Sequence, residues 1–474
     1  MKKTLLIVVL KIFLSFNSFS QDFLNSSLIN FLKSPEISNS IVGLQLQNQN
    51  GKILLSNNPK KSLIPASLQK LFTTAYVLNK LPLDFTFKTL VLSDGLIDTN
   101  TNILYGNLII STSGDPSLES RIYKSRSFIK DLRLLMLKLK IKSIEGKVVL
   151  KPLETDYQVN NQWLWSDLGN YYGSGYSSHT FRDNYVEVFF NSGKEIGEPT
   201  EIIKIDPNID SFHLINKVIV GESNRDLSYA YGAPLDETRL LVGTIPANKE
   251  NFKVKISMHN PKIFLQYAIE NTLLDLGITI NNSTNENITL SQLDTLMIYE
   301  SPTVNDLVMC VNSQSNNNYA EHILIKAVSK IKTDVTLNQS PAYLEDFWKD
   351  KLGISGVVFK DGCGLSRMNL SSPSSFNKLL SYQLNHSSVK EAFFNSLPVS
   401  GKSGTLKYIG DNTVLEGKFI GKSGSMGGVR CYSGCFVKNS KYFPFTIMIN
   451  NFTSNDYLIK SKIENLMIDI YKNI

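Results

Sequence analysis

The 474-residue sequence predicts an α/β protein in which one domain, built from both ends of the chain, carries a large β-rich insertion. Strand patterns occur near both ends, with helical patterns between them. From Phe85 to about Leu290 the chain instead consists mostly of short β runs separated by Gly, Asn and Asp. We therefore expect a host domain at residues 21–84 and 291–474, and an inserted β-rich region of two subdomains at residues 85–290.

Three segments indicate individual elements of the host domain. Ser38 to Leu55 predicts a β-hairpin, because apolar and polar residues alternate on either side of Asn50-Gly51. Near the C-terminus, Tyr442 to Asn450 predicts a strand, followed by a helix that Ser454 caps. The polar stretch from Ile280 to Leu290 predicts the end of the insertion.

The N-terminal residues 1–20 are typical of a secretory signal peptide. Lys2 and Lys3 precede a short apolar run that ends at Ser18-Phe19-Ser20. We therefore expect an exported, periplasmic protein. Without the three lysines of this segment the formal net charge falls from +7 to +4, which does not favour nucleic acid as a partner. Peripheral attraction to an anionic envelope polymer stays open.

The four cysteines predict neither a metal site nor a nearby disulfide. Cys431 and Cys435 fall in one predicted strand, about 13 Å apart, which is too far for a bridge. Cys310 and Cys363 have no Cys/His ligand spacing around them. We expect buried free thiols, no metal and no cofactor.

The first chemically informative segment is Pro65 to Ala75. Ser67 and Lys70 would lie one turn apart on the same face of a helix. A lysine in a partly dry cleft can be neutral enough to take the proton of a neighbouring hydroxyl, which makes the serine a nucleophile. The spacing alone is weak, because it recurs at Ser127/Lys130, Ser329/Lys332, Ser375/Lys378 and Ser387/Lys390.

Two later polar clusters have complementary chemistry. In Ser315-Asn316-Asn317, a second hydroxyl can pass a proton to a leaving amine and an amide can hold a lysine and a substrate, although such residues also favour loops and helix caps.

In Lys422-Ser423-Gly424-Ser425, on a predicted edge strand, the lysine and hydroxyl can bind a carboxylate. The glycine lets a substrate backbone come close. The rival copy at Lys402 lies in a Gly-rich segment that we expect to be a connecting loop.

Together the three motifs, in this order and in a protein expected to be exported, resemble those of penicillin-binding proteins and serine β-lactamases. The chain resembles most closely the class C low-molecular-mass penicillin-binding proteins, the D-alanyl-D-alanine carboxypeptidase/endopeptidases of the penicillin-binding protein 4 type. This resemblance implies a β-lactamase/transpeptidase-like domain, an antiparallel sheet flanked by helices, with a large insertion between the first two motifs. The matching stretches are residues 65–75, 106–116, 163–167, 313–321, 361–367, 397–406 and 422–425.

The resemblance also implies roles for individual residues. Ser67 would be the acylated nucleophile and Lys70 its base, with Ser315 and Asn317 from the second motif as further catalytic residues. Lys422 would be the catalytic lysine of the third motif. The substrate would contact Ser423, Gly424 and Ser425, and the N–H groups of Ser67 and Ser425 would form the oxyanion hole.

A side-chain pocket is implied as well. Asp167 falls where the family binds the amino end of the third residue of the peptide, and Arg367 and Met426 fall at the edge of that pocket. The chain departs from the family pattern at Asn316, Ser423 and Cys363, where Asp, Thr and Ser are usual. None of these changes removes a catalytic group.

The implied activity is cleavage of peptidoglycan stem peptides through an acyl-enzyme, with β-lactam antibiotics as covalent inhibitors. A serine β-lactamase is the first alternative. It would need a group that activates water, for which Glu187 or Glu270 could be proposed. A non-catalytic penicillin-binding envelope protein is the second alternative, and the intact Ser67, Lys70 and Lys422 argue against it.

Overall fold

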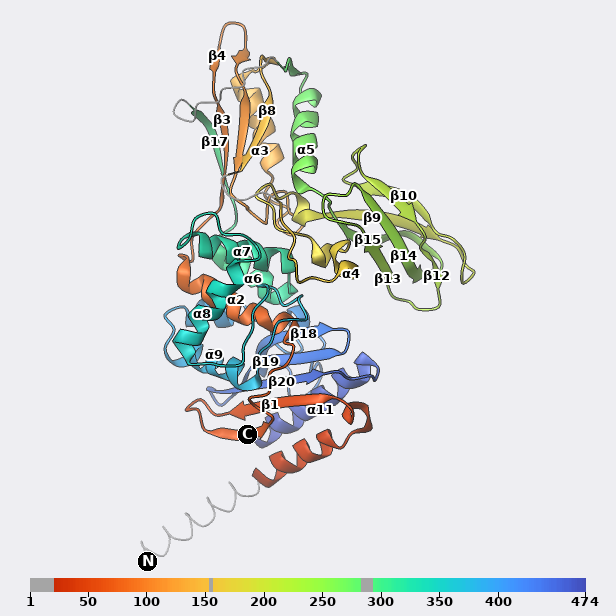
Figure 1. Ribbon diagram of the computed structural model, residues 1–474, viewed down its shortest axis with the longest axis vertical. Helices are drawn as coiled ribbons and strands as arrows, with labels where there is room; N and C mark the ends of the chain where they lie inside the picture. The colour runs from red at the N-terminus through yellow and green to blue at the C-terminus, as the bar shows by residue number, and fades with distance from the viewer. Residues whose placement is uncertain (1–20, 153–156, 283–292) are drawn as a thin grey trace, which may run out of the picture. The chain divides into compact units, whose positions relative to one another are not determined.

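The computed structural model describes residues 21–152, 157–282 and 293–474, which form two compact units (Figure 1). Within the described chain, the first unit comprises residues 21–81, 308–316 and 341–474, and the second comprises residues 82–307 and 317–340. The expected signal peptide at residues 1–20, and most of the polar segment expected to end the insertion, lie outside the described residues.

The first unit is built on a five-stranded antiparallel sheet (Figure 1). Strands from the two ends of the chain meet in it, because β1 from the N-terminal part pairs with β20 from the C-terminal part. This is the arrangement that strand patterns at both ends predict. The strands, in sheet order, are β18 (Phe419–Met426), β19 (Val429–Lys438), β20 (Lys441–Asn450), β1 (Ile41–Gln47) and β2 (Ile53–Asn57).

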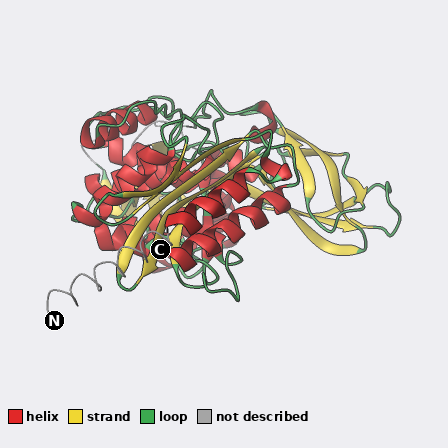
Figure 2. Ribbon diagram, turned by 90° about the horizontal axis from the view of Figure 1, so that it is seen from below, coloured by secondary structure: helices red, strands yellow, loops and turns green. Residues whose placement is uncertain are grey.

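Helices cover both faces of this sheet (Figure 2). On one face, residues 21–32 form a helix that shares a hydrophobic core with the C-terminal helix α11 (Asp456–Asn473) and with the strands. The other face meets α9 (Pro373–Asn385), so closely that a Cβ at Gly43 of β1 would lie 2.9 Å from Pro373. An antiparallel sheet flanked by helices is therefore observed, as predicted.

The predicted hairpin at its edge is confirmed, with β1 and β2 antiparallel on either side of Asn50-Gly51. The predicted cap of the last helix is wrong by one residue. Asn455, not Ser454, has the extended N-cap conformation, and its side chain accepts a hydrogen bond from the Tyr457 N–H. Both side chains can cap a helix, and only the backbone path decides which one faces the first turn.

The centre of the first unit is α2 (Gln69–Lys80), which is buried along most of its length. Phe72 packs its ring 5.1 Å from Phe359 and 5.0 Å from Phe376, and its carbonyl accepts a hydrogen bond of 3.0 Å from the Trp348 indole. These contacts fix α2 against its neighbours. The other helices around it are α6 (Val304–Gln314), α8 (Ser340–Leu352) and α10 (Lys390–Asn395).

The second unit contains most of the predicted β-rich region, in four sheets around one continuous hydrophobic core. Two sheets pack with α3 (Phe128–Leu139) and α5 (Pro261–Asp275). The first consists of β17 (Asp294–Glu300), β3 (Lys88–Ser93), β6 (Leu108–Thr112) and β8 (Val148–Pro152). The second consists of β16 (Thr279–Ile280), β7 (Ser143–Ile144), β5 (Ile103–Tyr105) and β4 (Leu96–Asp98).

The other two sheets are made from the middle of the chain. One consists of β10 (Glu201–Asp206), β9 (Tyr185–Ser192) and β15 (Lys249–Ser257). The last consists of β11 (His213–Asn216), β14 (Thr238–Pro246) and β12 (Ile219–Gly221), with β13 (Leu227–Tyr231) also paired to β14. The short helix α4 (Trp165–Leu168) precedes them in the chain.

Helix α7 (Asn317–Ser329) belongs to this second unit by compactness. Its first turn is held by the Tyr319 hydroxyl, which donates to Asp183 at 2.9 Å and also lies 2.8 Å from the Ser120 hydroxyl. The expected insertion boundaries at residues 85 and 290 stay a prediction.

All four cysteines are buried free thiols, as predicted. Burial raises the pKa of the Cys431 thiol to about 12, so it is protonated at neutral pH. Among the helices of the described chain, none combines the length and apolar character needed to cross a membrane.

The stability of the second unit depends on pH because of one buried acid. Asp115 follows β6, and burial raises its pKa to about 6. One carboxylate oxygen accepts hydrogen bonds from the backbone and hydroxyl of Ser117, while the other has no hydrogen-bond partner among the described residues. The folded state holds this proton more tightly than the unfolded chain does. The contribution of protonated Asp115 to the unfolding free energy is therefore fully present below about pH 4 and is lost as the pH rises through about 6.

We predict that the unfolding free energy of Asp115→Asn rises relative to that of wild type as the pH increases from 4 to 7. The difference between the two proteins should change by about 2–3 kcal/mol over this range. The asparagine keeps the acceptor for Ser117 and cannot ionise. Urea unfolding of both proteins at several pH values measures the difference. A difference in unfolding free energy that does not change with pH would contradict the prediction.

Candidate active site

Ser67 lies in a single turn of 3₁₀ helix, η2 (Ala66–Leu68), that leads directly into α2. Ala66, just before it, has a φ of +47°, in the left-handed region that alanine rarely adopts. The apolar residues that follow are fully buried, so the turn is fixed to a rigid helix while Ser67 itself stays partly exposed. A strained backbone residue next to a partly exposed serine is typical of a turn at a functional site.

Lys70 is brought to Ser67, as the spacing predicts. Its Nζ lies 3.1 Å from the Ser67 Oγ and donates a hydrogen bond of 2.6 Å to the carbonyl of Cys363. The Lys70 side chain is fully buried. Lys70 thus lies within hydrogen-bond distance of a hydroxyl whose proton a neutral lysine could accept.

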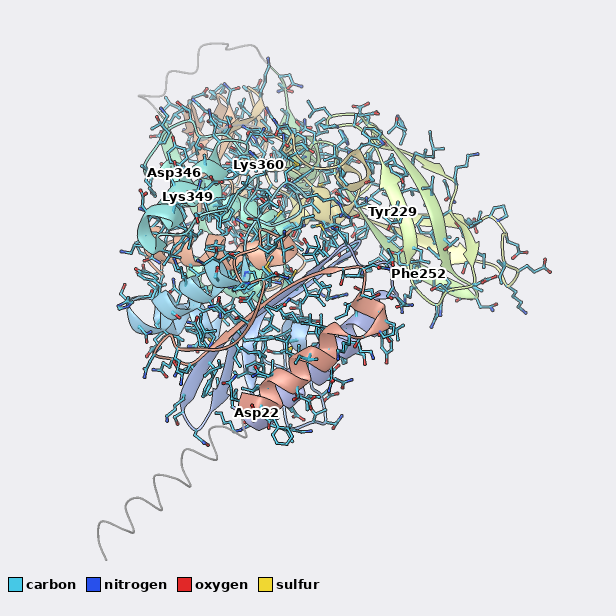
Figure 3. All side chains as sticks on the ribbon, turned by 60° about the horizontal axis from the view of Figure 1, so that its bottom comes forward. Asp22, Tyr229, Phe252, Asp346, Lys349 and Lys360 are labelled. Carbon is cyan, nitrogen blue, oxygen red and sulfur yellow. The ribbon has the colours of Figure 1, made fainter. Side chains whose placement is uncertain are left out.

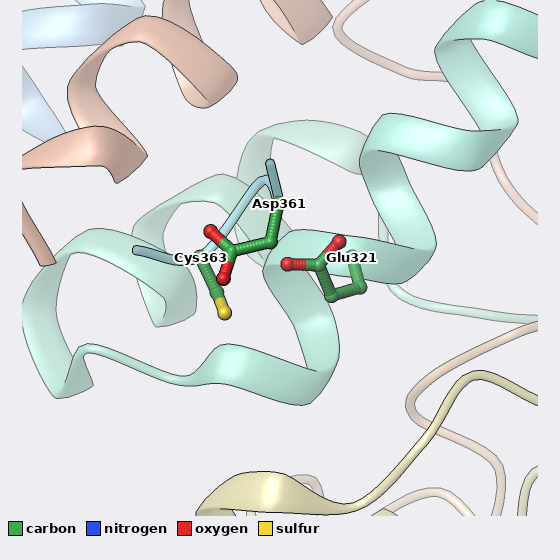
Figure 4. Close-up of side chains that lie close together, drawn as sticks. All are labelled: Glu321, Asp361 and Cys363. Carbon is green, nitrogen blue, oxygen red and sulfur yellow. The ribbon is translucent and has the colours of Figure 1, made fainter. Parts of the chain in front are cut away.

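The carbonyl that holds Lys70 belongs to a loop whose role sequence reasoning missed. Asp361 accepts hydrogen bonds of 2.6 Å from the backbone N–H groups of Gly364 and Ser366, and this closes the loop around Cys363. Figure 4 shows the Asp361 carboxylate close to the Cys363 side chain. Gly364 has a φ of +84°, and a Cβ there would lie 2.0 Å from the Ala66 carbonyl oxygen. The Asp-Gly-x-Gly pattern at 361–364 was the available signal, because it combines an acid that caps turns with glycines.

Ser315 lies just after α6, with a φ of +59°. Asn312, on the last turn of α6, donates hydrogen bonds to Thr74 at 3.2 Å and to Ser396 at 2.8 Å, which ties the end of α6 to α2. Serine pays a conformational cost in the left-handed region. Here that conformation directs the Ser315 hydroxyl to a lysine.

That lysine is Lys422 on the edge strand β18. Its Nζ donates hydrogen bonds to the Ser315 Oγ at 2.9 Å and to the Ser423 carbonyl at 2.8 Å. Burial, and then the charge of Lys70, lower the pKa of Lys422 well below its usual value. The first and third motifs thus place two buried lysines close enough to repel each other electrostatically.

Gly424 lets β18 lie directly against the serine turn. A Cβ at this position would lie 2.6 Å from the Pro65 carbonyl oxygen and 3.2 Å from the Ser67 nitrogen. Ser425 is exposed and Ser423 is partly exposed.

The rival motif has a different setting. Lys402 is exposed in a turn before the short 3₁₀ helix Gly404–Leu406, whereas Lys422 is fully buried. Of these two lysines, Lys422 donates a hydrogen bond to another motif, through Ser315. The loop position expected for Lys402 is observed.

Arg367 and Met426 come together at the turn between β18 and β19. Arg367 donates a hydrogen bond of 3.1 Å to the carbonyl of Gly427, the residue after Met426. Arg367 is exposed and Met426 is partly exposed. The structure therefore gathers these two residues at one end of β18.

Asn317 and Asp167 belong to the second unit, where one tyrosine connects them. The Asn317 side chain donates a hydrogen bond of 2.8 Å to the Tyr172 carbonyl, and the Tyr172 hydroxyl donates one of 3.4 Å to Asp167. Asp167 lies on α4 and is partly exposed. Burial, and then the charge of Asp167, raise the pKa of the Tyr172 hydroxyl.

The two acids considered for a β-lactamase are occupied elsewhere in the second unit. Glu187 forms ion pairs with Lys253 at 3.1 Å and with Arg121 at 3.7 Å. Glu270 on α5 accepts a hydrogen bond from Gln266. Glu187 thus pairs with residues of other elements of that unit, and Glu270 with a residue one turn away on α5.

The site combines a serine beside a buried lysine with a second serine bonded to another lysine, and an edge strand lies against the serine turn. This combination is typical of the penicillin-recognising serine hydrolases. The chain belongs to the D-Ala-D-Ala carboxypeptidase 3 (S13) family, whose model matches residues 24–473. It is by family a serine-type D-alanyl-D-alanine carboxypeptidase, which confirms the class that the sequence motifs predict.

Individual relatives agree with this membership. The chain is 28% identical over 443 residues to D-alanyl-D-alanine carboxypeptidase DacB of Haemophilus influenzae, covering 91% of this chain and 89% of DacB. The crystal structure of penicillin binding protein 4 (dacB) from the same organism superposes with a TM-score of 0.76 at 22% identity, covering 93% of this chain and 98% of the other. A structure of that protein complexed with a novel β-lactam gives 0.72 at 22% identity, covering 94% and 98%. The predicted transpeptidase-like fold is thus confirmed.

The two Lys-Ser-Gly copies allow a matched test. We predict that Lys422→Ala lowers kcat/KM for a D-Ala-D-Ala peptide by at least about tenfold, the effect of one charged hydrogen bond. Lys402→Ala should change kcat/KM by less than about twofold, because an exposed lysine in a turn contributes little. Steady-state kinetics of the two variants measures both effects, and equal losses, or a larger loss at Lys402, would show that the wrong copy has been assigned.

Proposed function

We propose that the protein cleaves peptidoglycan stem peptides as a D-Ala-D-Ala carboxypeptidase, an endopeptidase or both, through an acyl-enzyme on Ser67. The observation that carries this proposal is the 3.1 Å distance between the Ser67 Oγ and a fully buried Lys70 Nζ. A buried amine at hydrogen-bond distance is what a serine nucleophile needs as its base.

In the first step Lys70 takes the Ser67 proton while the Oγ attacks the carbonyl carbon of the scissile amide. The carbonyl oxygen becomes an oxyanion, for which the N–H groups of Ser67 and Ser425 are the proposed donors. The close approach of β18 to the Ser67 nitrogen at Gly424 supports this assignment.

In the second step the C–N bond breaks and the leaving amine takes a proton. Ser315 can supply it from its hydroxyl and recover one from Lys422, whose Nζ lies 2.9 Å away. In a carboxypeptidase reaction the leaving amine is that of the terminal D-Ala, and in an endopeptidase reaction it belongs to the side chain of a cross-linked residue. Water then adds to the ester carbonyl while one of its protons passes to Lys422. Lys70 returns its proton to the departing Ser67 Oγ, and the shortened peptide leaves as a carboxylic acid.

The low pKa of Lys422 gives the substrate a part in this scheme. A terminal carboxylate beside Lys422 would stabilise its charged form, which burial and Lys70 otherwise disfavour. Repulsion between the two lysines then favours a neutral Lys70, the form that can accept the Ser67 proton. Ser423 is proposed to assist in binding the same carboxylate.

Asn317, Asp167, Arg367 and Met426 are proposed to bind the remainder of the peptide. Asn317 would hold a substrate amide, and Asp167 would bind an ammonium group on the third residue, with Arg367 and Met426 at the edge of that pocket. Within the second unit, the shared contact with Tyr172 supports a joint role for Asn317 and Asp167.

We further propose that residues 1–20 direct export to the periplasm and that β-lactams acylate Ser67. The structure of the Haemophilus influenzae protein complexed with a β-lactam supports the second point. The motifs of a serine β-lactamase are also present, but Glu187 and Glu270 are engaged within the second unit, and no other observation favours that alternative.

Ser67→Ala should abolish covalent labelling by penicillin, because Ser67 supplies the oxygen that forms the bond. Lys70→Ala should slow labelling by about 10²–10⁴-fold, the usual effect of losing a general base. Lys80→Ala, on the last turn of the same helix, is the matched control and should label at the wild-type rate. Labelling of the Ser67→Ala protein at another serine, or a loss below about threefold for Lys70→Ala, would contradict the assignment.

The stability of the adduct distinguishes the activities. A long-lived penicilloyl-enzyme is expected for the proposed peptidase, whereas rapid turnover of the drug would indicate a β-lactamase. No adduct and no turnover would indicate a protein that only binds. Mass spectrometry of the intact protein over time measures all three outcomes.

Asp167→Ala should reduce kcat/KM on peptides whose third residue carries a free amino group. The expected loss of transition-state stabilisation is about 1.5–3 kcal/mol, the range for a hydrogen bond to a charged group. Penicillin acylation should hardly change, because a simple penicillin has no matching ammonium. Asp210→Ala removes an exposed acid of the same unit and serves as the control. A parallel loss on both substrates would mean damage to the catalytic centre, and no loss on either would remove Asp167 from substrate binding.

A further inference from the structure

Two cavities in the second unit share a wall and are made only of residues of that unit. The larger has a volume of about 610 Å³ and includes Arg121 and Tyr185 in its lining. The smaller has a volume of about 450 Å³ and includes Tyr171 and Tyr229. Lys253 and Lys255, from β15, line both cavities, so the two form neighbouring parts of one concave surface.

Lys255 is the central cation of this surface. Its Nζ lies 4.7 Å from the centre of the Tyr185 ring and 5.6 Å from that of Tyr171. It is partly buried, and it has neither a hydrogen bond nor an ion pair among the described residues. Burial lowers its pKa, which nearby Glu187 partly offsets. A partly desolvated ammonium with no carboxylate in contact has capacity left for an anion.

The larger cavity also carries an excess of positive charge. Six basic residues line it against three acidic ones, and the acids already have partners. Glu187 pairs with Lys253 at 3.1 Å, Asp206 pairs with Arg182 at 2.5 Å, and Glu119 accepts from the N–H of Ile129 at 2.8 Å. The local excess of three cations attracts an anionic ligand into a concave site, where the field is concentrated.

The smaller cavity adds exposed aromatic rings. Tyr171 is 48% exposed and Tyr229, labelled on β13 in Figure 3, is 47% exposed. The negative face of a tyrosine ring attracts the C–H face of a sugar, while its hydroxyl can bond to a sugar hydroxyl. Tyr172 lines the same cavity and contacts both Asp167 and Asn317, the proposed peptide-binding residues of this unit.

We infer that this surface is an accessory binding site for polymeric peptidoglycan. Lys255 and the surrounding basic residues bind a carboxylate of a stem peptide, and the exposed tyrosines contact sugar rings of the glycan. The inference rests on the proposed function, since it extends recognition of the same substrate beyond the scissile bond. It gives the second unit a role in holding the enzyme on an insoluble polymer.

The test is binding of the full-length mature protein to purified peptidoglycan sacculi, measured by co-sedimentation. The sacculi are first treated with hydrofluoric acid to remove attached phosphate polymers. We expect Lys255→Gln to weaken binding about tenfold, the effect of losing a charged hydrogen bond. Tyr229→Ala should also weaken binding. Lys204→Gln is the matched control. Lys204, on β10, lies 5.4 Å from the centre of the Phe189 ring of β9 but lines neither cavity.

The chemistry of the ligand is tested on the polymer itself. Amidation of its carboxylates with a carbodiimide and ammonia should reduce wild-type binding to the level of Lys255→Gln. Unchanged binding after amidation, or loss of wild-type binding after hydrofluoric acid alone, would overturn the carboxylate assignment. The second result would point to phosphate as the anion.

Covalent labelling with penicillin counts the folded, active molecules in each preparation. Wild type that neither labels nor cleaves a D-Ala-D-Ala peptide would refute the proposed function. Wild type that labels while Lys255→Gln binds sacculi as tightly, or wild type that does not bind them at all, would refute the accessory site alone.

Discussion

The burial of Lys70 against Ser67 is the constraint on which the rest of the first unit depends. A buried amine must be satisfied by protein groups, and here these include the Ser67 hydroxyl and the Cys363 carbonyl. The carbonyl is available because Asp361 closes its loop with two backbone hydrogen bonds. The hydroxyl is available because the core around Phe72 fixes the helix that follows it. The packing of the surrounding core therefore positions the reactive groups of this site.

A second consequence follows from placing Lys422 nearby. Protonation of two neighbouring buried lysines is electrostatically unfavourable. Burial and the charge of Lys70 therefore lower the pKa of Lys422. In the proposed mechanism a substrate carboxylate relieves this repulsion. In that mechanism the electrostatics of the free enzyme favour an anionic chain end. The same arrangement would favour β-lactams, which carry a carboxylate near the reactive carbonyl.

In the proposed mechanism, the second unit binds the remainder of the substrate. Tyr172 joins Asn317 of the second motif to Asp167 by contacts of its carbonyl and hydroxyl. The same tyrosine lines the cavity bordered by Lys255. Recognition of the peptide and of the polymer would thus be built on one group of elements with a continuous hydrophobic core. On these proposals the insertion would take part in substrate recognition and would not be only a scaffold.

The sequence by itself determined the fold class, the order of the motifs and the pairing of Ser67 with Lys70, because these depend on local spacing and on strand and helix periodicity. It also favoured Lys422 over Lys402 through the strand pattern that follows. Only the tertiary structure decided that the Cys363 carbonyl holds Lys70, that Ser315 meets Lys422 and that Asn455 caps the last helix. It alone also revealed Lys255 between two tyrosines. Those relations join residues far apart in the chain, or depend on the path of the backbone, and neither leaves a periodic trace in the sequence.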